Sequence, residues 1–205
     1  MDDSPSSRPT TPATASATTS TAVAKRILIT GGLRSGKSRY AAQLAKHLAG
    51  DDVSYIAMLA ASDEEMLWRL DGHRAYHPSA WQMLTRHIKP RDAIAKADHQ
   101  VIVLDSLTGW VANLLLEHEV SGEAAALDAV TRESDQFISL LQELDKTIII
   151  ATNEVGLGVL PETSLGRWLR EALGDVNQRL ATICDAVALV TVGIPQCIKG
   201  DLPEV

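Results

Sequence analysis

The feature that most constrains this fold is a glycine-rich turn between a short apolar strand pattern and a helical pattern. Residues 31–38 read Gly-Gly-Leu-Arg-Ser-Gly-Lys-Ser and fit G-x-x-x-x-G-K-[ST]. Residues 27–30 before them predict a strand, and the spacing of Tyr40, Leu44 and Leu48 after them predicts a helix. This order of elements is the P-loop context, in which backbone N–H groups surround phosphate oxygens. The alternative is a turn that only joins a strand to a helix.

The rest of the chain repeats the alternation of apolar strands and helices. Strands are predicted at 27–30, 53–57, 101–104, 147–151 and 187–190, with a short antiparallel edge strand after 193–195. Helices are predicted after Ser62, which forms a capping-box pattern with Glu65, and over about 107–115, 124–144 and 165–184. Such strands indicate an α/β fold with a mostly parallel sheet and helices on both faces.

Composition separates a tail from one domain. Residues 1–24 are dominated by Ser, Thr, Pro and Ala and offer little apolar surface to bury, so we expect a disordered tail. Residues 25–205 are expected to form a single nucleotide-binding domain. No apolar run approaches the roughly 18 residues of a membrane-spanning helix. The two cysteines, Cys184 and Cys197, suit packing in a reduced cytoplasm better than a disulfide framework.

Charge argues against nucleic acid as a partner. The 19 Lys and Arg residues and 26 Asp and Glu residues give a formal net charge of −7. Proteins that grip a phosphate backbone need basic stripes, and anionic membrane surfaces attract basic segments for the same reason.

Three side chains are expected to handle the phosphates. Lys37 would reach the β- and γ-phosphates, and the Ser38 hydroxyl would ligate Mg²⁺. Asp105 follows the apolar strand 101–104, the place of a Walker B acid that orients Mg²⁺, although it would also suit the N-cap of the next helix. Ligands of open α/β sheets bind outside the carboxyl ends of the strands, so Asp105 and the P-loop would share one edge.

His73 lies on the charged stripe of a predicted helix, at the border with its apolar face. Glu65, Arg69 and His73 lie four residues apart, beside the apolar residues Met66 and Leu70. A neutral imidazole is a competent nucleophile. By itself His73 is better described as a surface or capping histidine, and spacing alone does not choose among the six histidines.

The ordered motifs resemble those of the bifunctional adenosylcobinamide kinase / adenosylcobinamide-phosphate guanylyltransferase family of cobalamin biosynthesis. The likeness runs over about residues 26–200. It is carried by residues 27–39, 55–57, Arg69-Leu70, His73-Arg74, Pro78, Trp81, 104–108, 113–115, the Asn-Glu-Val-Gly segment within 152–162, 167–170, Gly174 and the Asn-Gln-Arg segment within 177–181.

The resemblance implies a P-loop (RecA-like) fold and two reactions. ATP or GTP phosphorylates adenosylcobinamide. GTP then guanylylates a histidine, releasing pyrophosphate, and the GMP passes to adenosylcobinamide phosphate to give adenosylcobinamide-GDP. The family's catalytic histidine falls on His73. The family also implies a homotrimer. Mg²⁺ is expected from the P-loop residues. Composition predicts a cytoplasmic protein with no nucleic-acid partner and no integral membrane segment.

The resemblance also implies the nucleotide contacts. They fall on Gly31, Gly32, Leu33, Arg34, Ser35, Gly36, Lys37, Ser38, Ala57, Met58, Leu59, Arg74, Ala75, Tyr76, His77, Thr85 and Asp105, with Ser38 and Asp105 as the metal ligands. His77 stands where many members have arginine, and Thr85 stands where glutamate is common.

Two other functions remain open from the sequence. One is a P-loop kinase of another small alcohol or nucleoside, in which His73 is structural. The other is a non-enzymatic nucleotide-binding module, because P-loop folds serve many functions.

Overall fold

A computed structural model describes residues 25–58, 77–85 and 89–205. Its centre is a seven-stranded sheet in the order β3-β2-β4-β5-β1-β6-β7. All neighbouring strands are parallel except β6 and β7, which are antiparallel. The strands are β1 (Arg26–Gly31), β2 (Val53–Ala57), β3 (Gln82–Thr85), β4 (Val101–Asp105), β5 (Thr147–Asn153), β6 (Ala186–Thr191) and β7 (Ile194–Lys199).

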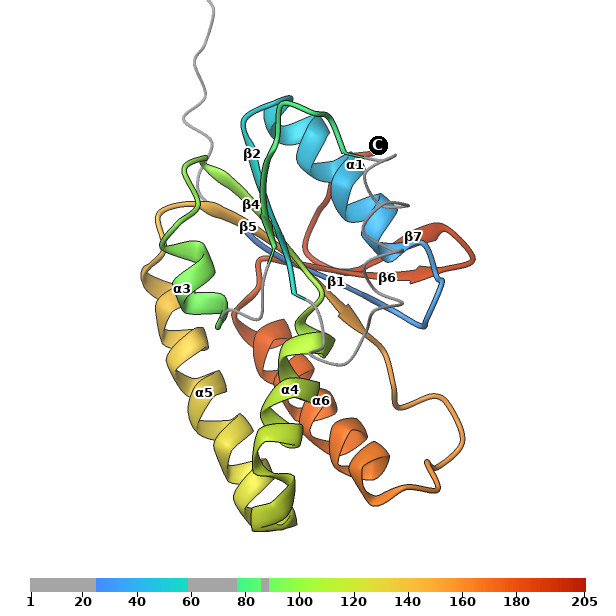
Figure 1. The fold of residues 1–205 in the computed structure, drawn as a ribbon. Helices are drawn as coiled ribbons and strands as arrows, with labels where there is room; N and C mark the ends of the chain where they lie inside the picture. The colour runs from blue at the N-terminus through green and yellow to red at the C-terminus, as the bar shows by residue number, and fades with distance from the viewer. Residues whose placement is uncertain (1–24, 59–76, 86–88) are drawn as a thin grey trace, which may run out of the picture.

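Helices cover both faces of the sheet, as predicted. The described helices are α1 (Lys37–Ala49), α3 (Pro90–Ile94), α4 (Leu107–His118), the 3₁₀ turn η1 (Glu119–Ser121), α5 (Glu123–Glu143) and α6 (Ser164–Ile183). Figure 1 shows α1 on one face and α3, α4, α5 and α6 on the other. The sheet therefore separates two buried clusters.

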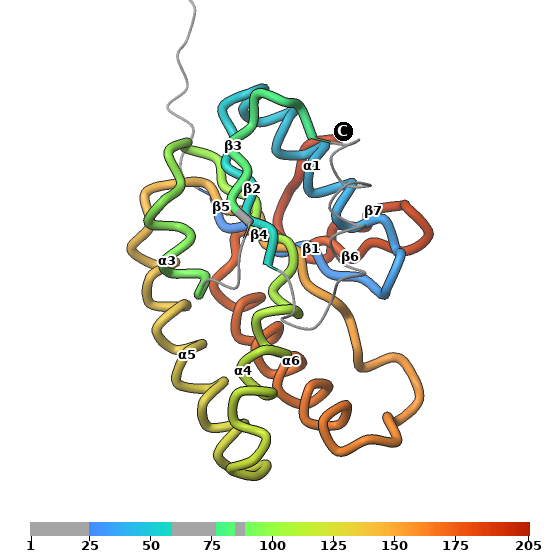
Figure 2. The backbone as a smooth tube through the Cα atoms, viewed as in Figure 1, coloured from blue at the N-terminus to red at the C-terminus, as the bar shows by residue number. Residues whose placement is uncertain are grey.

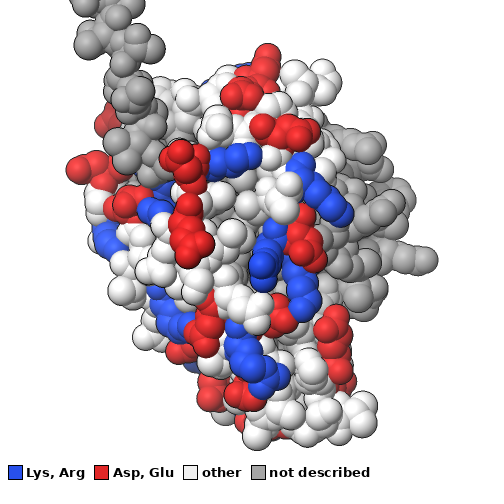
Figure 3. Space-filling model, turned by 90° about the vertical axis from the view of Figure 1, so that its left-hand side faces the viewer, with Lys and Arg blue, Asp and Glu red and all other residues white. Residues whose placement is uncertain are grey.

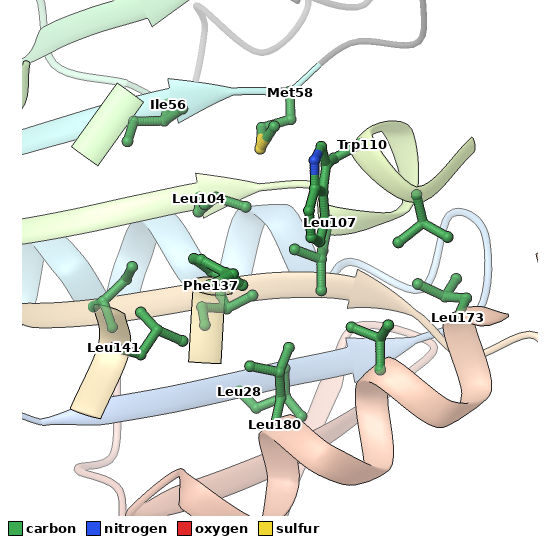
Figure 4. Close-up of a cluster of buried hydrophobic side chains, with 14 of the residues drawn as sticks. Leu28, Ile56, Met58, Leu104, Leu107, Trp110, Phe137, Leu141, Leu173 and Leu180 are labelled. Carbon is green, nitrogen blue, oxygen red and sulfur yellow. The ribbon is translucent and has the colours of Figure 1, made fainter. Parts of the chain in front are cut away.

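The larger cluster joins the sheet to α4, α5 and α6. Leu28 and Leu104 point from the sheet toward Phe137 and Leu180, and Trp110 lies beside Met58 (Figure 4). On the other face, the residues of α1 pack against alternate residues of β1, β2, β4 and β5. Successive strand residues thus divide between the two faces, as strand geometry requires.

The five apolar strands and the antiparallel edge strand are confirmed, but two elements were not predicted. β3 is only four residues long and mixes Gln82 and Thr85 with two apolar residues, so it lacks a strand signal. α3 is a five-residue helix that begins at Pro90. The predicted helix after Ser62 and the predicted tail 1–24 lie outside the described residues.

The packing role predicted for the two cysteines holds for only one of them. Cys184 is buried in the larger cluster, and burial raises the pKa of its thiol to about 12. Cys197 is exposed, so that prediction is wrong. The reason is its position on β7, the edge strand whose residues are all exposed.

Acidic and basic side chains are interspersed on the face that carries α3 and α5 (Figure 3). Lys89 pairs with Glu133 at 2.5 Å, and Arg179 pairs with Asp135. Within the described parts of the chain, no helix is both long and apolar enough to cross a bilayer.

Candidate active site

The P-loop is a tight turn that leads straight into α1. The N–H of Ser35 donates to the carbonyl of Gly32 (3.1 Å), and the N–H of Tyr40 donates to the carbonyl of Gly36 (3.0 Å). Gly36 is the N-cap of α1 at φ 95°, a left-handed conformation that glycine adopts without a steric penalty. Gly36 has no side chain to cap the helix, so the first N–H groups of α1 are available to an anion.

Lys37 lies folded over this turn. Its ammonium donates to the carbonyl oxygen of Gly32 at 3.3 Å, and the residue is only 7% exposed. Burial lowers the pKa of Lys37, and the negative charge of Asp105 acts in the opposite direction to a smaller extent. A buried ammonium with a long hydrogen bond of this kind can exchange it for a stronger contact with a phosphate group.

Two neighbouring segments brace the P-loop. The N–H of Gly193, in the β6–β7 turn, donates to the carbonyl of Ser35 at 2.7 Å, and the two loops lie side by side in Figure 2. A Cβ on Gly36 would lie 3.0 Å from the Cα of Gly193. On the other side, the N–H of Glu154 donates to the carbonyl of Gly31 at 3.0 Å.

Asp105 is the last residue of β4, and its carboxylate is held by a tyrosine. The hydroxyl of Tyr55 donates to Oδ2 of Asp105 at 2.5 Å. Burial raises the pKa of Tyr55 well above its ordinary value, and the charge of Asp105 and this hydrogen bond add to that effect. The N-cap of α4 is Ser106, so the alternative prediction of Asp105 as the cap is wrong. Asp105 ends the strand and therefore precedes the cap position.

The sheet brings the P-loop and Asp105 to the same edge and the same face. β5 lies between their strands, with Gly31 paired to Asn153 and Asp105 paired to Ala151. By strand alternation Gly31, Asp105 and Asn153 all belong to the face that α1 covers. Lys37, at the start of α1, is on that face as well.

These residues fit a divalent cation bound with a triphosphate. Asp105 retains its second carboxylate oxygen, and the half-buried Ser38 offers a hydroxyl at the start of α1. Carboxylate and hydroxyl oxygens are the hard ligands that Mg²⁺ prefers. The arrangement suits transfer of a phosphoryl or nucleotidyl group.

The predicted nucleotide contacts beyond the P-loop divide into two groups. Ala57 pairs with Asp105 on one side and Thr85 on the other, so three strand ends meet there. Met58 donates its N–H to the carbonyl of Asp105 at 2.8 Å, and the His77 ring packs 4.0 Å from the Tyr55 ring. The remaining predicted residues lie outside the described part of the chain: Leu59, His73, Arg74, Ala75 and Tyr76.

Several polar residues that organise this edge carry the family resemblance, but no role in the site was assigned to them from the sequence. Thr152 donates to Oδ1 of Asn177 (2.8 Å), and Asn177 donates to the carbonyl of Asn153 (3.0 Å). The N–H of Asn153 donates to the Thr108 hydroxyl at 3.0 Å. The available signal was the pair of polar residues, Thr152 and Asn153, at the carboxyl end of β5. That signal points to the site only when β5 is known to lie between β1 and β4.

Comparison with known proteins decides the family. The model of the cobinamide kinase / cobinamide phosphate guanyltransferase family matches residues 27–198. The chain belongs to this family. As a member of this family, the protein is an enzyme that catalyses both phosphoryl transfer and guanylyl transfer. Of the three functions open from the sequence, this membership supports the bifunctional enzyme.

Curated relatives in the cobinamide kinase / guanyltransferase family match over nearly their whole length. The bifunctional adenosylcobalamin biosynthesis protein CobU of Escherichia coli (strain K12) is 37% identical over 186 residues, covering 84% of this chain and 99% of the relative. CobU of Salmonella typhimurium is 38% identical over 183 residues, covering 84% and 99%. CobP of Pseudomonas aeruginosa is 36% identical over 178 residues, covering 86% and 98%.

A solved structure supports the fold alone. An ATPase from the type III secretion system of pathogenic bacteria aligns with a TM-score of 0.53 and 13% identity, over 82% of this chain and 51% of that one. The chain thus spans about half the length of that ATPase, and the predicted P-loop α/β fold is confirmed.

Proposed function

We propose that this member of the cobinamide kinase / guanyltransferase family acts through a covalent GMP–His73 intermediate. It phosphorylates adenosylcobinamide with ATP or GTP. It then moves GMP from GTP to adenosylcobinamide phosphate, releasing pyrophosphate. The observation that carries the proposal is one sheet edge with Lys37 and Asp105 on the same face, in a chain that aligns with bifunctional relatives nearly end to end. The role of His73 rests on the resemblance of the motif around it.

In the phosphorylation step the chain binds and orients the nucleotide. The N–H groups at the start of α1 would hold phosphate oxygens, and Lys37 would exchange its weak contact with Gly32 for the β- and γ-phosphates. Ser38 and Asp105 would hold Mg²⁺, which when bound neutralises charge on the phosphates. Asp105 is also the candidate to accept the proton of the acceptor hydroxyl.

In the guanylyl step an imidazole nitrogen of His73 attacks the α-phosphorus of GTP. The N–P bond forms, and the bond from phosphorus to the bridging oxygen breaks. Pyrophosphate leaves with that electron pair, and Lys37 with Arg34 or Arg74 would disperse its charge. A phosphate oxygen of adenosylcobinamide phosphate then attacks the same phosphorus, and the imidazole leaves with the N–P electrons.

Labelling tests the intermediate. The protein is incubated with GTP labelled at the α-phosphate and with GTP labelled at the γ-phosphate. We expect an acid-labile, base-stable label from the α-position only, lost in His73→Ala and retained in a matched variant, His118→Ala, at the far end of α4. Label that survives His73→Ala would contradict the role of His73. Absence of α-label alongside normal kinase turnover would favour a kinase without guanylyltransferase activity.

Three broader features belong to the same proposal. Residues 25–205 would act as one domain, the chain would assemble as a homotrimer, and the enzyme would work in the cytoplasm. The family resemblance supports all three. Light scattering tests the assembly, with an expected mass three times the 22.1 kDa of the chain.

A further inference from the structure

Tyr55 is a buried residue of β2 whose hydroxyl contacts the carboxylate of Asp105. The residue is 1% exposed, and within the described parts of the chain its hydroxyl donates a hydrogen bond to Oδ2 of Asp105 at 2.5 Å. Tyr55 pairs with Val103, two positions before Asp105 on β4. Two strand residues span about 6.6 Å, so the long side chain reaches along the sheet to the carboxylate.

Neighbouring rings fix the direction of the Tyr55 side chain. The His77 ring lies 4.0 Å from it between centroids, and the Trp81 ring is stacked at 6.4 Å. Trp81 is itself anchored, because its indole N–H donates to the carbonyl of Gly50 at 3.0 Å. These contacts hold the phenol ring in one orientation, in which its hydroxyl reaches Asp105.

We propose that Tyr55 is a positioning residue for Asp105. By occupying Oδ2, it sets the carboxylate in one rotamer and leaves Oδ1 to the cation. A hydrogen bond to an ionised acceptor is about twice as strong as one between neutral groups, so this contact is suited to hold a ligand in place. The inference rests on the role of Asp105 in the proposed function.

The chemistry of the surroundings favours this role over simple packing. The smaller cluster that includes Tyr55 contains many aliphatic residues, among them Val103, Ile29 and Ala57. A phenylalanine would fill that space without a hydroxyl to satisfy. Among the described residues, the hydroxyl donates its hydrogen bond to the carboxylate of Asp105.

The test compares Tyr55→Phe, Asp105→Asn, the double variant and a matched control. Tyr40→Phe is the control, because Tyr40 is another buried tyrosine of the same cluster. Calorimetry measures the affinity for a slowly hydrolysed GTP analogue with Mg²⁺ and with EDTA. Thermal unfolding verifies that each variant folds, and Phe keeps the ring that packs against His77 and Trp81.

We expect Tyr55→Phe to weaken Mg²⁺-dependent binding by about tenfold to a hundredfold, the range found when the partner of a metal ligand is lost. Binding in EDTA should be unchanged, and Tyr40→Phe should match the parent in both conditions. The kinase kcat should fall with little change in the KM for adenosylcobinamide. In the double variant, Tyr55→Phe should add little to Asp105→Asn.

Four outcomes would overturn the inference. Equal losses with Mg²⁺ and with EDTA would mark Tyr55 as structural, as would losses that add fully in the double variant. If Asp105→Asn weakens Mg²⁺-dependent binding and Tyr55→Phe does not, Tyr55 has no positioning role and the proposed function stands. If Asp105→Asn itself has no effect, the metal role of Asp105 in the proposed function fails together with this inference.

Discussion

At the scale of single residues, the buried charge of Lys37 destabilises the protein when no nucleotide is bound. Its ammonium is largely removed from water, and burial lowers its pKa more than Asp105 raises it. The folded chain thus gives up a proton more readily than the unfolded chain. Just below the ordinary lysine pKa, the unfolded state binds more protons, so the stability of the empty protein should increase as pH rises there.

Lys37→Met tests this account. We expect the free energy of unfolding of the empty variant at pH 7 to equal or exceed that of the parent, because an apolar chain of similar length needs no hydration. Nucleotide affinity should fall by about a hundredfold, since charged hydrogen bonds to phosphate are lost. Denaturant unfolding and calorimetry measure the two quantities. A less stable variant would show that the Gly32 contact outweighs the cost of burial.

At the scale of elements, the P-loop depends on the turn between β6 and β7. Gly36→Ala introduces a Cβ at φ 95° and 3.0 Å from the Cα of Gly193. We expect the free energy of unfolding to fall by about 1–2 kcal/mol, the cost of a left-handed alanine. Nucleotide binding should weaken too, because the loop must shift away from the hairpin.

Gly32→Ala is the matched control for the loop. Gly32 lies outside the left-handed region, and a Cβ there meets no described atom within 4 Å. Its free energy of unfolding should stay within about 0.5 kcal/mol of the parent by chemical denaturation. Similar losses in both variants would show that neither the left-handed backbone of Gly36 nor its contact with Gly193 is the cause.

The elements also show what a sequence can and cannot predict here. β1, β4 and β5 are uninterrupted apolar runs between turn signals, so local pattern was enough to find them. β3 forms because β2 offers it a parallel edge, which is not a local property. The P-loop has a local motif, whereas the contact between Tyr55 and Asp105 depends on the register of two strands that are about 50 residues apart.

At the scale of the whole molecule, composition predicts a tail over residues 1–24 and a domain over residues 25–205. We expect removal of residues 1–24 to leave the melting temperature and both turnover rates unchanged, because that segment offers little apolar surface. Scanning calorimetry and steady-state assays of the truncated and full chains measure this. A melting temperature several degrees lower would show that the segment packs on the domain.

The place of β5 between β1 and β4 has a consequence for the two reactions. Neighbouring strands lie about 4.8 Å apart, so the backbone ends that carry the P-loop and Asp105 are separated by about 10 Å. One bound triphosphate with its counter-ion could therefore contact both Lys37 and Asp105. If the guanylyl step uses this edge too, kinase and guanylyltransferase turnover should alternate on one chain, with nucleotide exchange between them.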